Sequence, residues 1–349
     1  MNPAYPLLPI GNFVSAALIL ISMLNISVRQ SWNTGVCVSA LWGFLMAIVT
    51  GVDAVVWADN ASVPVSPIWS DIASHIQIGS NVGVPMSTFI ITRRLYKIVE
   101  IRSVNPPTRR EVSGLLVDWC LGLGVPVIMM GVYYVVQTSR FQTLEEYGCS
   151  YATASTGLTS ILIDGWSVVL PTISIVFYSK IFYLIYHHNK QFNDFLQSQR
   201  NLPRSRYLRI LALGCIDAFG TLPIGILVFV VDVRSVDDFW PGWSVVHSKA
   251  DWPPQSFSTA LWSQNKWSRI GLHFSQWINV ADGVVFFLFF GLTGEARALY
   301  RRAFGRVVEK LGWRASPASP PDRPGVSGMV FGSRQVGGTV DIPQYVHVV

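Results

Sequence analysis

The stretch Leu7–Val28 reads LLPIGNFVSAALILISMLNISV and decides the class of fold. It contains no Asp, Glu, Lys or Arg, and as a helix it is long enough to cross a hydrocarbon core of about 30 Å. The residues before Leu7 lack the basic region of a cleavable signal peptide, so we expect this first span to remain in the protein. The sequence therefore predicts an integral membrane protein.

Six more apolar stretches follow the first. We predict spans at Val36–Trp57, Ile72–Thr92, Ser113–Val136, Leu158–Tyr186, Leu208–Val231 and Ile270–Leu292. Only 13% of the 349 residues are charged, against roughly 25% in a soluble domain, and the mean hydropathy is +0.39. Four spans contain an interior proline, which a bundle tolerates because neighbouring helices bond the freed backbone groups. We therefore expect an all-α membrane protein, a bundle of seven transmembrane helices.

The positions of the basic residues predict the orientation. With the N-terminus outside, 20 of the 26 Lys and Arg residues fall in inside segments and five in outside segments. Membrane proteins retain such an excess of positive charge on the inner side. We therefore predict an N-out, C-in topology. The net charge of +6 then reflects topology and does not indicate binding to nucleic acid.

A short basic helix is predicted directly after the last span. Apolar residues recur there at helical spacing: Leu299, Tyr300, Ala303, Phe304, Val307, Val308 and Leu311. Basic residues occupy the other faces: Arg297, Arg301, Arg302, Arg306 and Lys310. We expect an amphipathic helix on the inner leaflet. The predicted organisation is a bundle over residues 1–292, a juxtamembrane helix over 293–314 and a disordered cytoplasmic tail over 315–349.

Five aspartates lie in or at the edge of the predicted spans: Asp53, Asp118, Asp164, Asp217 and Asp282. Charges inside a bilayer are costly and usually face the interior of the bundle. Because no Lys or Arg lies deep in a span, we expect these carboxyls to be protonated, hydrogen-bonded or hydrated in a cavity. They serve either as structural links between helices or as a proton relay, a cation site or a conformational switch.

Two spans carry stripes of polar residues. The third span has Ser74, Gln77, Asn81 and Thr88 on one helical face, and the seventh has His273, Gln276, Asn279 and Asp282. The face in the third span should point inward, whereas the stripe in the seventh winds around its helix. His273 and Gln276 lie near the outer end, where they either line an outward-facing pocket or pack against other helices.

The outside loop between the sixth and seventh spans is long and aromatic. Its rings belong to Phe239, Trp240, Trp243, Trp252, Phe257, Trp262 and Trp267. An aromatic belt at the membrane interface needs residues near the ends of spans. Trp243, His247 and Trp252 lie in the middle of the loop instead, which favours a folded lid over a pocket for an apolar ligand.

The chain lacks the residues that several other classes of protein require. Cys149 lies in an outside loop without an obvious partner, so we expect no disulfide framework. A light-driven pump needs a Schiff-base lysine in the seventh span, but Lys266 lies only at its outer edge. The histidines are scattered, and we predict no metal, no cofactor and no catalytic residue. A proton-coupled carrier that uses the span aspartates remains the alternative function.

Six motifs occur in an order and topology that are specific together. They are Gly83-Val84-Pro85, TRRLYKI over 92–98, EEYGC over 145–149, RYLRILAL over 206–213, WPGW over 240–243 with His247, and FFGLTGEAR over 289–297 with Tyr300. Together they resemble the fungal mating-pheromone receptors of the a-factor type, which are G-protein-coupled receptors. The resemblance extends from the first span through Tyr300.

This resemblance implies a plasma-membrane receptor, not an enzyme, for a secreted farnesylated peptide. Its partners would be that lipidated peptide, membrane lipids and a heterotrimeric G protein that activates a mating MAP-kinase cascade. The resemblance leaves open whether the protein forms a homodimer. Rhodopsin-type receptors differ, because this chain has no Asp-Arg-Tyr after the third span and no Asn-Pro-x-x-Tyr in the seventh.

Three groups of residues are assigned roles on this basis. For ligand binding we predict Gln77, Asn81, Asp164, Trp243, His247, His273 and Gln276. For switching we predict Asp217, Asp282 and Pro223. For coupling to the G protein we predict Arg93, Arg94, Tyr96, Arg206 and Arg209. Topology alone would also retain these arginines inside.

Overall fold

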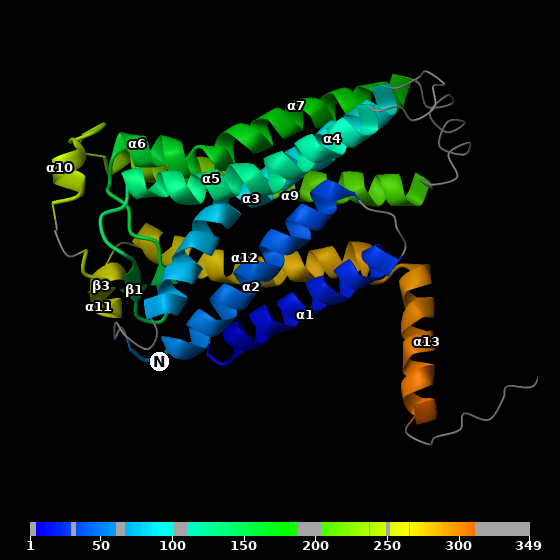
Figure 1. The fold of residues 1–349 in the computed structure, drawn as a ribbon, viewed down its shortest axis with the longest axis horizontal. Coiled ribbons are helices and arrows are strands. Elements are labelled where there is room, and N and C mark those ends of the chain that lie inside the picture. Colours follow the sequence, from blue (N-terminus) through cyan, green and yellow to red (C-terminus); the bar gives the residue numbers. More distant parts are fainter. Residues whose placement is uncertain are drawn as a thin grey trace, which may run out of the picture. The chain divides into compact units, whose positions relative to one another are not determined.

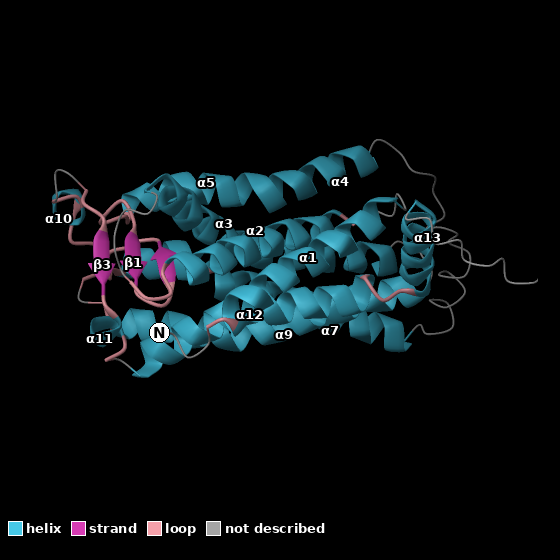
Figure 2. Ribbon diagram, turned by 90° about the horizontal axis from the view of Figure 1, so that it is seen from below, coloured by secondary structure: helices cyan, strands magenta, loops and turns pink. Residues whose placement is uncertain are grey.

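The computed structural model describes residues 5–28, 33–60, 67–100, 110–187, 204–236, 238–248, 252–264 and 266–310. The chain forms two compact units, Met1–Arg301 and Arg302–Val349. The first unit is a bundle of long helices with a small sheet at one end (Figure 1 and Figure 2). The predicted tail over residues 315–349 lies outside the described part of the chain.

Long helical segments make up the bundle. Six are single helices: α1 (Leu7–Val28), α2 (Thr34–Val56), α3 (Pro67–Glu100), α7 (Trp166–His187), α9 (Arg204–Arg234) and α12 (Lys266–Phe290). A composite segment joins α4 (Arg110–Trp119), the π-helical turn η1 (Cys120–Gly124), α5 (Val125–Val132) and the 3-10 turn η2 (Tyr133–Val135). Pro126 lies in the first turn of α5, directly after η1, where a missing backbone N–H is tolerated.

Six of the described helical segments are long and apolar enough to cross a membrane, in agreement with six of the predicted spans. They are Leu7–Ile26, Thr34–Val56, Gly114–Val135, Trp166–His187, Tyr207–Arg234 and Arg269–Phe290. The remaining predicted span lies in α3, which packs against α2, α5, α7 and α9. Because so much of α3 contacts protein, it can carry polar residues that lower its hydropathy. Its passage through a membrane stays a prediction.

The expectation of a purely α-helical protein is wrong in one region. Three short strands, β1 (Gln142–Leu144), β2 (Gly148–Ser150) and β3 (Gln255–Phe257), form a sheet in the order β2-β1-β3. β1 and β2 form an antiparallel hairpin, and β3 joins β1 in parallel from the loop between α9 and α12. The hairpin turn requires positive φ at Glu146 (67°) and Gly148 (113°). We call this end of the bundle the sheet end.

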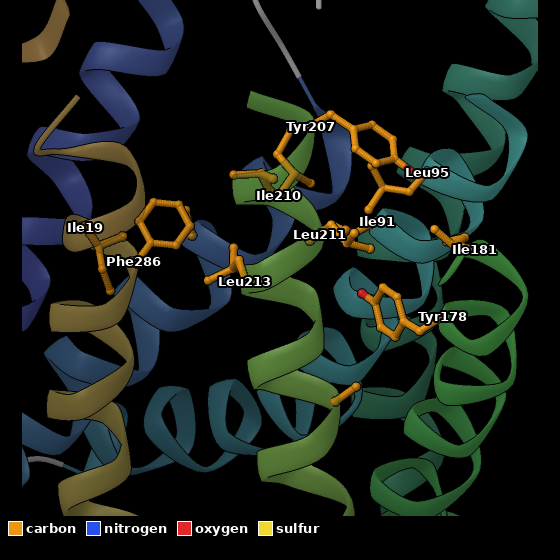
Figure 3. Packing of buried hydrophobic residues seen from close by; sticks show 13 residues of the cluster. Ile19, Ile91, Leu95, Tyr178, Ile181, Tyr207, Ile210, Leu211, Leu213 and Phe286 are labelled. Atoms are coloured by element: carbon orange, nitrogen blue, oxygen red, sulfur yellow. The ribbon is translucent and has the colours of Figure 1, made fainter. Parts of the chain in front are cut away.

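The main hydrophobic core lies toward the end of the bundle opposite the sheet. Its labelled members in Figure 3 are Ile19, Ile91, Leu95, Tyr178, Ile181, Tyr207, Ile210, Leu211, Leu213 and Phe286. They join the second halves of α3 and α7 to the first turns of α9, with Ile19 from α1 and Phe286 from α12. The half of α9 nearer the sheet is more exposed, for example at Ile226 and Leu227. The bundle is therefore more tightly packed away from the sheet.

The predicted helix after the last span corresponds to α13 (Gly294–Lys310). Its first part belongs to the bundle unit, where the side-chain amide of Asn25 on α1 donates to the Tyr300 hydroxyl at 2.6 Å. Its remainder belongs to the second unit, in which Phe304 is exposed. Binding of this helix to an inner leaflet stays a prediction.

Candidate functional site

The hairpin formed by β1 and β2 is attached to the inward polar face of α3. The Gln77 amide donates to the Cys149 backbone oxygen at 2.8 Å, and the Asn81 amide donates to the Tyr151 hydroxyl at 3.3 Å. Asp53 on α2 accepts the Trp69 indole N–H at 2.8 Å and also bonds the backbone of Cys149. Gln77 and Asn81 thus point inward, as predicted, and they bond the hairpin.

The Cys149 thiol is enclosed beneath the hairpin. It is 0% exposed and donates to the Ser70 backbone oxygen at 3.4 Å. Burial raises the pKa of this thiol to about 12, so it remains neutral at ordinary pH. All four cysteines, each within the described residues, are free, which agrees with the expected lack of a disulfide framework.

The two predicted ligand residues of α12 also lie beneath the sheet end. Gln276 is 2% exposed, and its amide lies 3.4 Å from the backbone oxygens of Glu146 and Tyr147 in the hairpin turn. The His273 ring makes an edge contact with Trp262 of α11 (Thr259–Trp262), with 6.1 Å between ring centroids. Gln77 and Gln276 therefore contact the same hairpin from two helices.

The loop between α9 and α12 is folded, as the positions of its aromatic residues predict. The carboxylate of Glu145 accepts the Thr259 backbone N–H at 2.8 Å, and its backbone oxygen accepts the Trp262 indole at 3.1 Å. These bonds join the loop to the hairpin, next to the pairing of β3 with β1. That the loop between α9 and α12 acts as a lid over a ligand stays a prediction.

Trp243 and His247 belong to a separate aromatic group. Trp243 begins α10 (Trp243–Val246), and its ring stacks on His247 with 4.0 Å between centroids. His247 stacks on Trp252, which in turn stacks on Tyr134 of η2 at 5.1 Å. Trp243 is 51% exposed. The structure thus gathers these rings over η2, whereas Gln276 contacts the hairpin turn.

Asp164 lies in a polar pocket with a second aspartate that the sequence analysis did not single out. The pocket has a volume of about 180 Å³ and lies between η3 (Ser160–Asp164), the end of α9 and the segment after β2. The side chains of Asp164 and Asp232 hydrogen-bond to each other. Asp232 falls one residue beyond the predicted span ending at Val231, which explains why it was missed.

The predicted switch aspartates are neighbours. The Thr88 hydroxyl of α3 donates to the Asp217 carboxylate of α9, and Asp217 interacts electrostatically with Asp282 of α12. Three helices thus meet around this polar contact. Pro223 lies within α9, which continues through it.

One expectation about the span aspartates is wrong. Asp118 on α4 is 1% exposed and forms ion pairs with both Arg93 and Arg94. The predicted third span ended at Thr92, but α3 continues to Glu100 and holds both arginines inside the bundle beside α4. A buried carboxylate is thereby paired with two guanidinium groups, which satisfies it electrostatically.

The other predicted coupling residues have local contacts. The Tyr96 ring makes an edge contact with Phe177 of α7, with 5.3 Å between centroids. The Arg209 guanidinium donates to the Ser205 backbone oxygen one turn earlier, at 3.1 Å. The side chain of Arg206 lies outside the described residues. Among the described side chains of this group, Asp118 joins Arg93 and Arg94.

The helix bundle with its apolar helices defines a multi-pass membrane protein. The model of the STE3 family, pheromone A receptor, matches residues 7–309, and the chain belongs to this family. The family resemblance predicted from the motifs is therefore confirmed.

Relatives of the chain include fungal pheromone receptors. The pheromone B alpha 3 receptor of Schizophyllum commune is 30% identical over 316 residues, which cover 89% of this chain and 49% of that protein. The pheromone a factor receptor of Saccharomyces cerevisiae is 24% identical over 304 residues, which cover 85% and 62% of the two chains. The chain spans about half the length of the Schizophyllum relatives that it matches.

Proposed function

We propose that this protein is a seven-span plasma-membrane receptor for a farnesylated peptide pheromone. On binding, it activates a heterotrimeric G protein and, through it, a mating MAP-kinase cascade. The observation that carries this proposal is the family match over residues 7–309, which covers every described helix of the bundle. The proposal is supported by relatives that are named as pheromone receptors, one of which is the pheromone a factor receptor of Saccharomyces cerevisiae.

The proposed orientation has the sheet end outside the cell. Basic residues support it by their distribution along the described chain up to the end of α12. Four lie toward the sheet: Arg140, Arg234, Lys266 and Arg269. Eight lie toward the opposite end: Arg93, Arg94, Lys97, Arg110, Lys180, Arg204, Arg206 and Arg209. The side with more Lys and Arg is usually the cytoplasmic side.

The ligand would bind beneath the sheet end. The amides of Gln77, Asn81 and Gln276 suit the polar backbone of a peptide, but they bond the hairpin and Tyr151 in this structure, so a bound peptide would have to replace these bonds. The exposed rings of Trp243 and Phe239 offer apolar surface for an isoprenoid chain. Burial of each CH₂ of such a chain contributes about 0.8 kcal/mol, so a farnesyl group would supply much of the affinity.

The G protein would bind at the opposite end, near the last turns of α3 and the first turns of α9. Within the described part of the chain, Arg209 bonds only Ser205 of its own helix, so its guanidinium can be redirected to carbonyls or a terminal carboxylate. Arg93 and Arg94 both pair with Asp118, so either one would have to leave this carboxylate before it could bind the G protein.

The test is expression of the chain in a reporter yeast that lacks its own receptors, challenged with a panel of farnesylated peptides. We expect at least one peptide to activate the reporter, and its version without the farnesyl group to be weaker by about a hundredfold or more. Equal potency of the two versions contradicts lipopeptide recognition. Substrate-dependent proton flux without any effect of guanine nucleotides would instead support the carrier alternative.

A further inference from the structure

The polar pocket at the sheet end holds an acidic pair with no basic partner. Asp164 in η3 and Asp232 in α9 hydrogen-bond to each other, and no described residue forms an ion pair with either. A carboxyl–carboxyl hydrogen bond requires a proton on one of the two groups. The pair therefore holds at least one proton, and with a single shared proton it carries one negative charge.

A third group in this pocket points to a ligand. Ser160 lines the pocket one turn before Asp164 and is 2% exposed, yet its hydroxyl has no hydrogen-bond partner among the described residues. Buried hydroxyls are nearly always bonded. Other hydroxyls of the pocket are occupied: Thr159 donates to the Ala154 oxygen at 2.7 Å, and Ser235 donates to the Val231 oxygen at 3.0 Å.

We propose that this pocket binds a primary ammonium group of a peptide, either its N-terminus or a lysine side chain. An ammonium has three N–H donors and one charge, and Asp164, Asp232 and Ser160 supply three acceptors. This inference rests on the proposed function as a peptide receptor. It adds the charge that the peptide must carry and the residues that bind it.

Other cations fit the pocket less well. A guanidinium group is planar and pairs best with two oxygens of one carboxylate, which would leave Ser160 unbonded. Calcium prefers six to eight oxygen ligands. The described residues contain no cluster of three or more His, Cys, Asp or Glu side chains that could hold a metal ion.

Binding exchanges the shared proton for the ammonium. The proton leaves to water, both carboxylates bond the ammonium, and the pocket keeps a net charge of −1. The pocket thus gains a ligand without gaining buried charge, which would be costly. Protons and ammonium compete for the same pair, so acid should weaken binding. Burial raises the pKa of Tyr151, the other titratable group that lines the pocket, so it stays neutral throughout.

The experiment measures thermal unfolding of the full chain in lipid nanodiscs with n-butylammonium chloride. Tetramethylammonium chloride at equal ionic strength is the control salt, because it has the charge but no N–H donor. We expect n-butylammonium to protect the wild-type protein more than the control salt does. In D164N/D232N the concentration for half-maximal protection should rise by about tenfold or more. Asp238→Asn, an exposed aspartate that does not line the pocket, should behave like the wild type.

Two further measurements keep the test decisive if the double variant folds poorly. Ser160→Ala leaves the carboxyl pair intact and should raise the half-maximal concentration by about threefold or more. In the wild-type protein, protection should be weaker at about pH 5 than at about pH 7.5, because protons compete. Equal protection by both salts, protection independent of pH, or unchanged protection in D164N/D232N would each overturn the proposal.

Modified peptides then show whether the bound ammonium group is the N-terminus of the peptide or a lysine side chain. For a farnesylated peptide that activates the reporter, either acetylation of the N-terminus or replacement of lysine by norleucine should lower the potency, and the sensitive change identifies the group. Full potency after both changes would overturn the inference. Binding of n-butylammonium does not require signalling, so a chain that binds it through Asp164 and Asp232 but responds to no farnesylated peptide would contradict only the proposed function.

Discussion

At the scale of single residues, Asp118 determines what Arg93 and Arg94 are free to do. Its carboxylate is buried on α4 and pairs with both guanidinium groups, whose side chains are 22% and 23% exposed. Substitution of either arginine would therefore disturb this ion pair as well as any contact with a G protein. Arg209, whose bonds to described residues are all to Ser205 in the preceding turn of its own helix, gives the cleaner test of coupling.

We expect Asp118→Asn to lower the free energy of unfolding by about 1–3 kcal/mol, because it leaves two partly buried positive charges without their carboxylate. Chemical or thermal unfolding of the purified protein measures this loss. Arg209→Gln is the control and should unfold like the wild type. An Asp118→Asn protein as stable as the wild type would mean that the arginines turn to water at no cost.

At the scale of elements, the hairpin is held by side chains of the helices beneath it. Gln77 bonds the Cys149 backbone at 2.8 Å, whereas the neighbouring bond from Asn81 to Tyr151 is longer, at 3.3 Å. The Cys149 thiol is fully buried and its raised pKa keeps it protonated, so its alkylation requires the hairpin to open.

We expect Gln77→Ala to increase the rate of alkylation at Cys149 by roughly tenfold, because one hydrogen bond that closes the hairpin is lost. Mass spectrometry of the labelled peptides separates this site from the exposed Cys120. Asn81→Ala is the matched control and should increase the rate less. If Gln77→Ala labels Cys149 no faster than the wild type does, the hairpin is held by its other contacts.

At the scale of the whole molecule, the contact around Asp217 joins three helices that would have to move in signalling. Thr88 of α3 donates to Asp217 of α9, and Asp282 of α12 interacts electrostatically with Asp217. The first turns of α9 pack tightly into the main core (Figure 3). A change in the charge of this contact would shift the balance between two packings of the bundle.

We expect Asp282→Asn to lower basal signalling by severalfold, because removal of one carboxyl reduces repulsion between α9 and α12 and favours the packed arrangement. Reporter output without peptide, normalised to surface expression, measures the change. Asp59→Asn, in the exposed turn after α2, should leave it unaltered. Unchanged basal and stimulated signalling in Asp282→Asn would remove this residue from the switch.

The sequence by itself determined the apolar helices and the family. Hydropathy over about 20 residues is a local property, so Leu7–Val28 begins and ends in the structure as predicted. The polar stripe on α3 also predicted its inward face, because helical spacing places Gln77 and Asn81 on one side. The motifs identified the family without any structure.

Only the tertiary structure decided which of these elements meet. The pairing of β3 with β1 joins residues more than a hundred positions apart, and three-residue strands leave little pattern in a sequence. Beyond Thr92, α3 continues through Leu95, which packs in the main core, and this brings Arg93 and Arg94 to Asp118. The pairing of Asp164 with Asp232 depends on how η3 and α9 pack, because a carboxyl's partner is set by distance in space rather than by spacing along the chain.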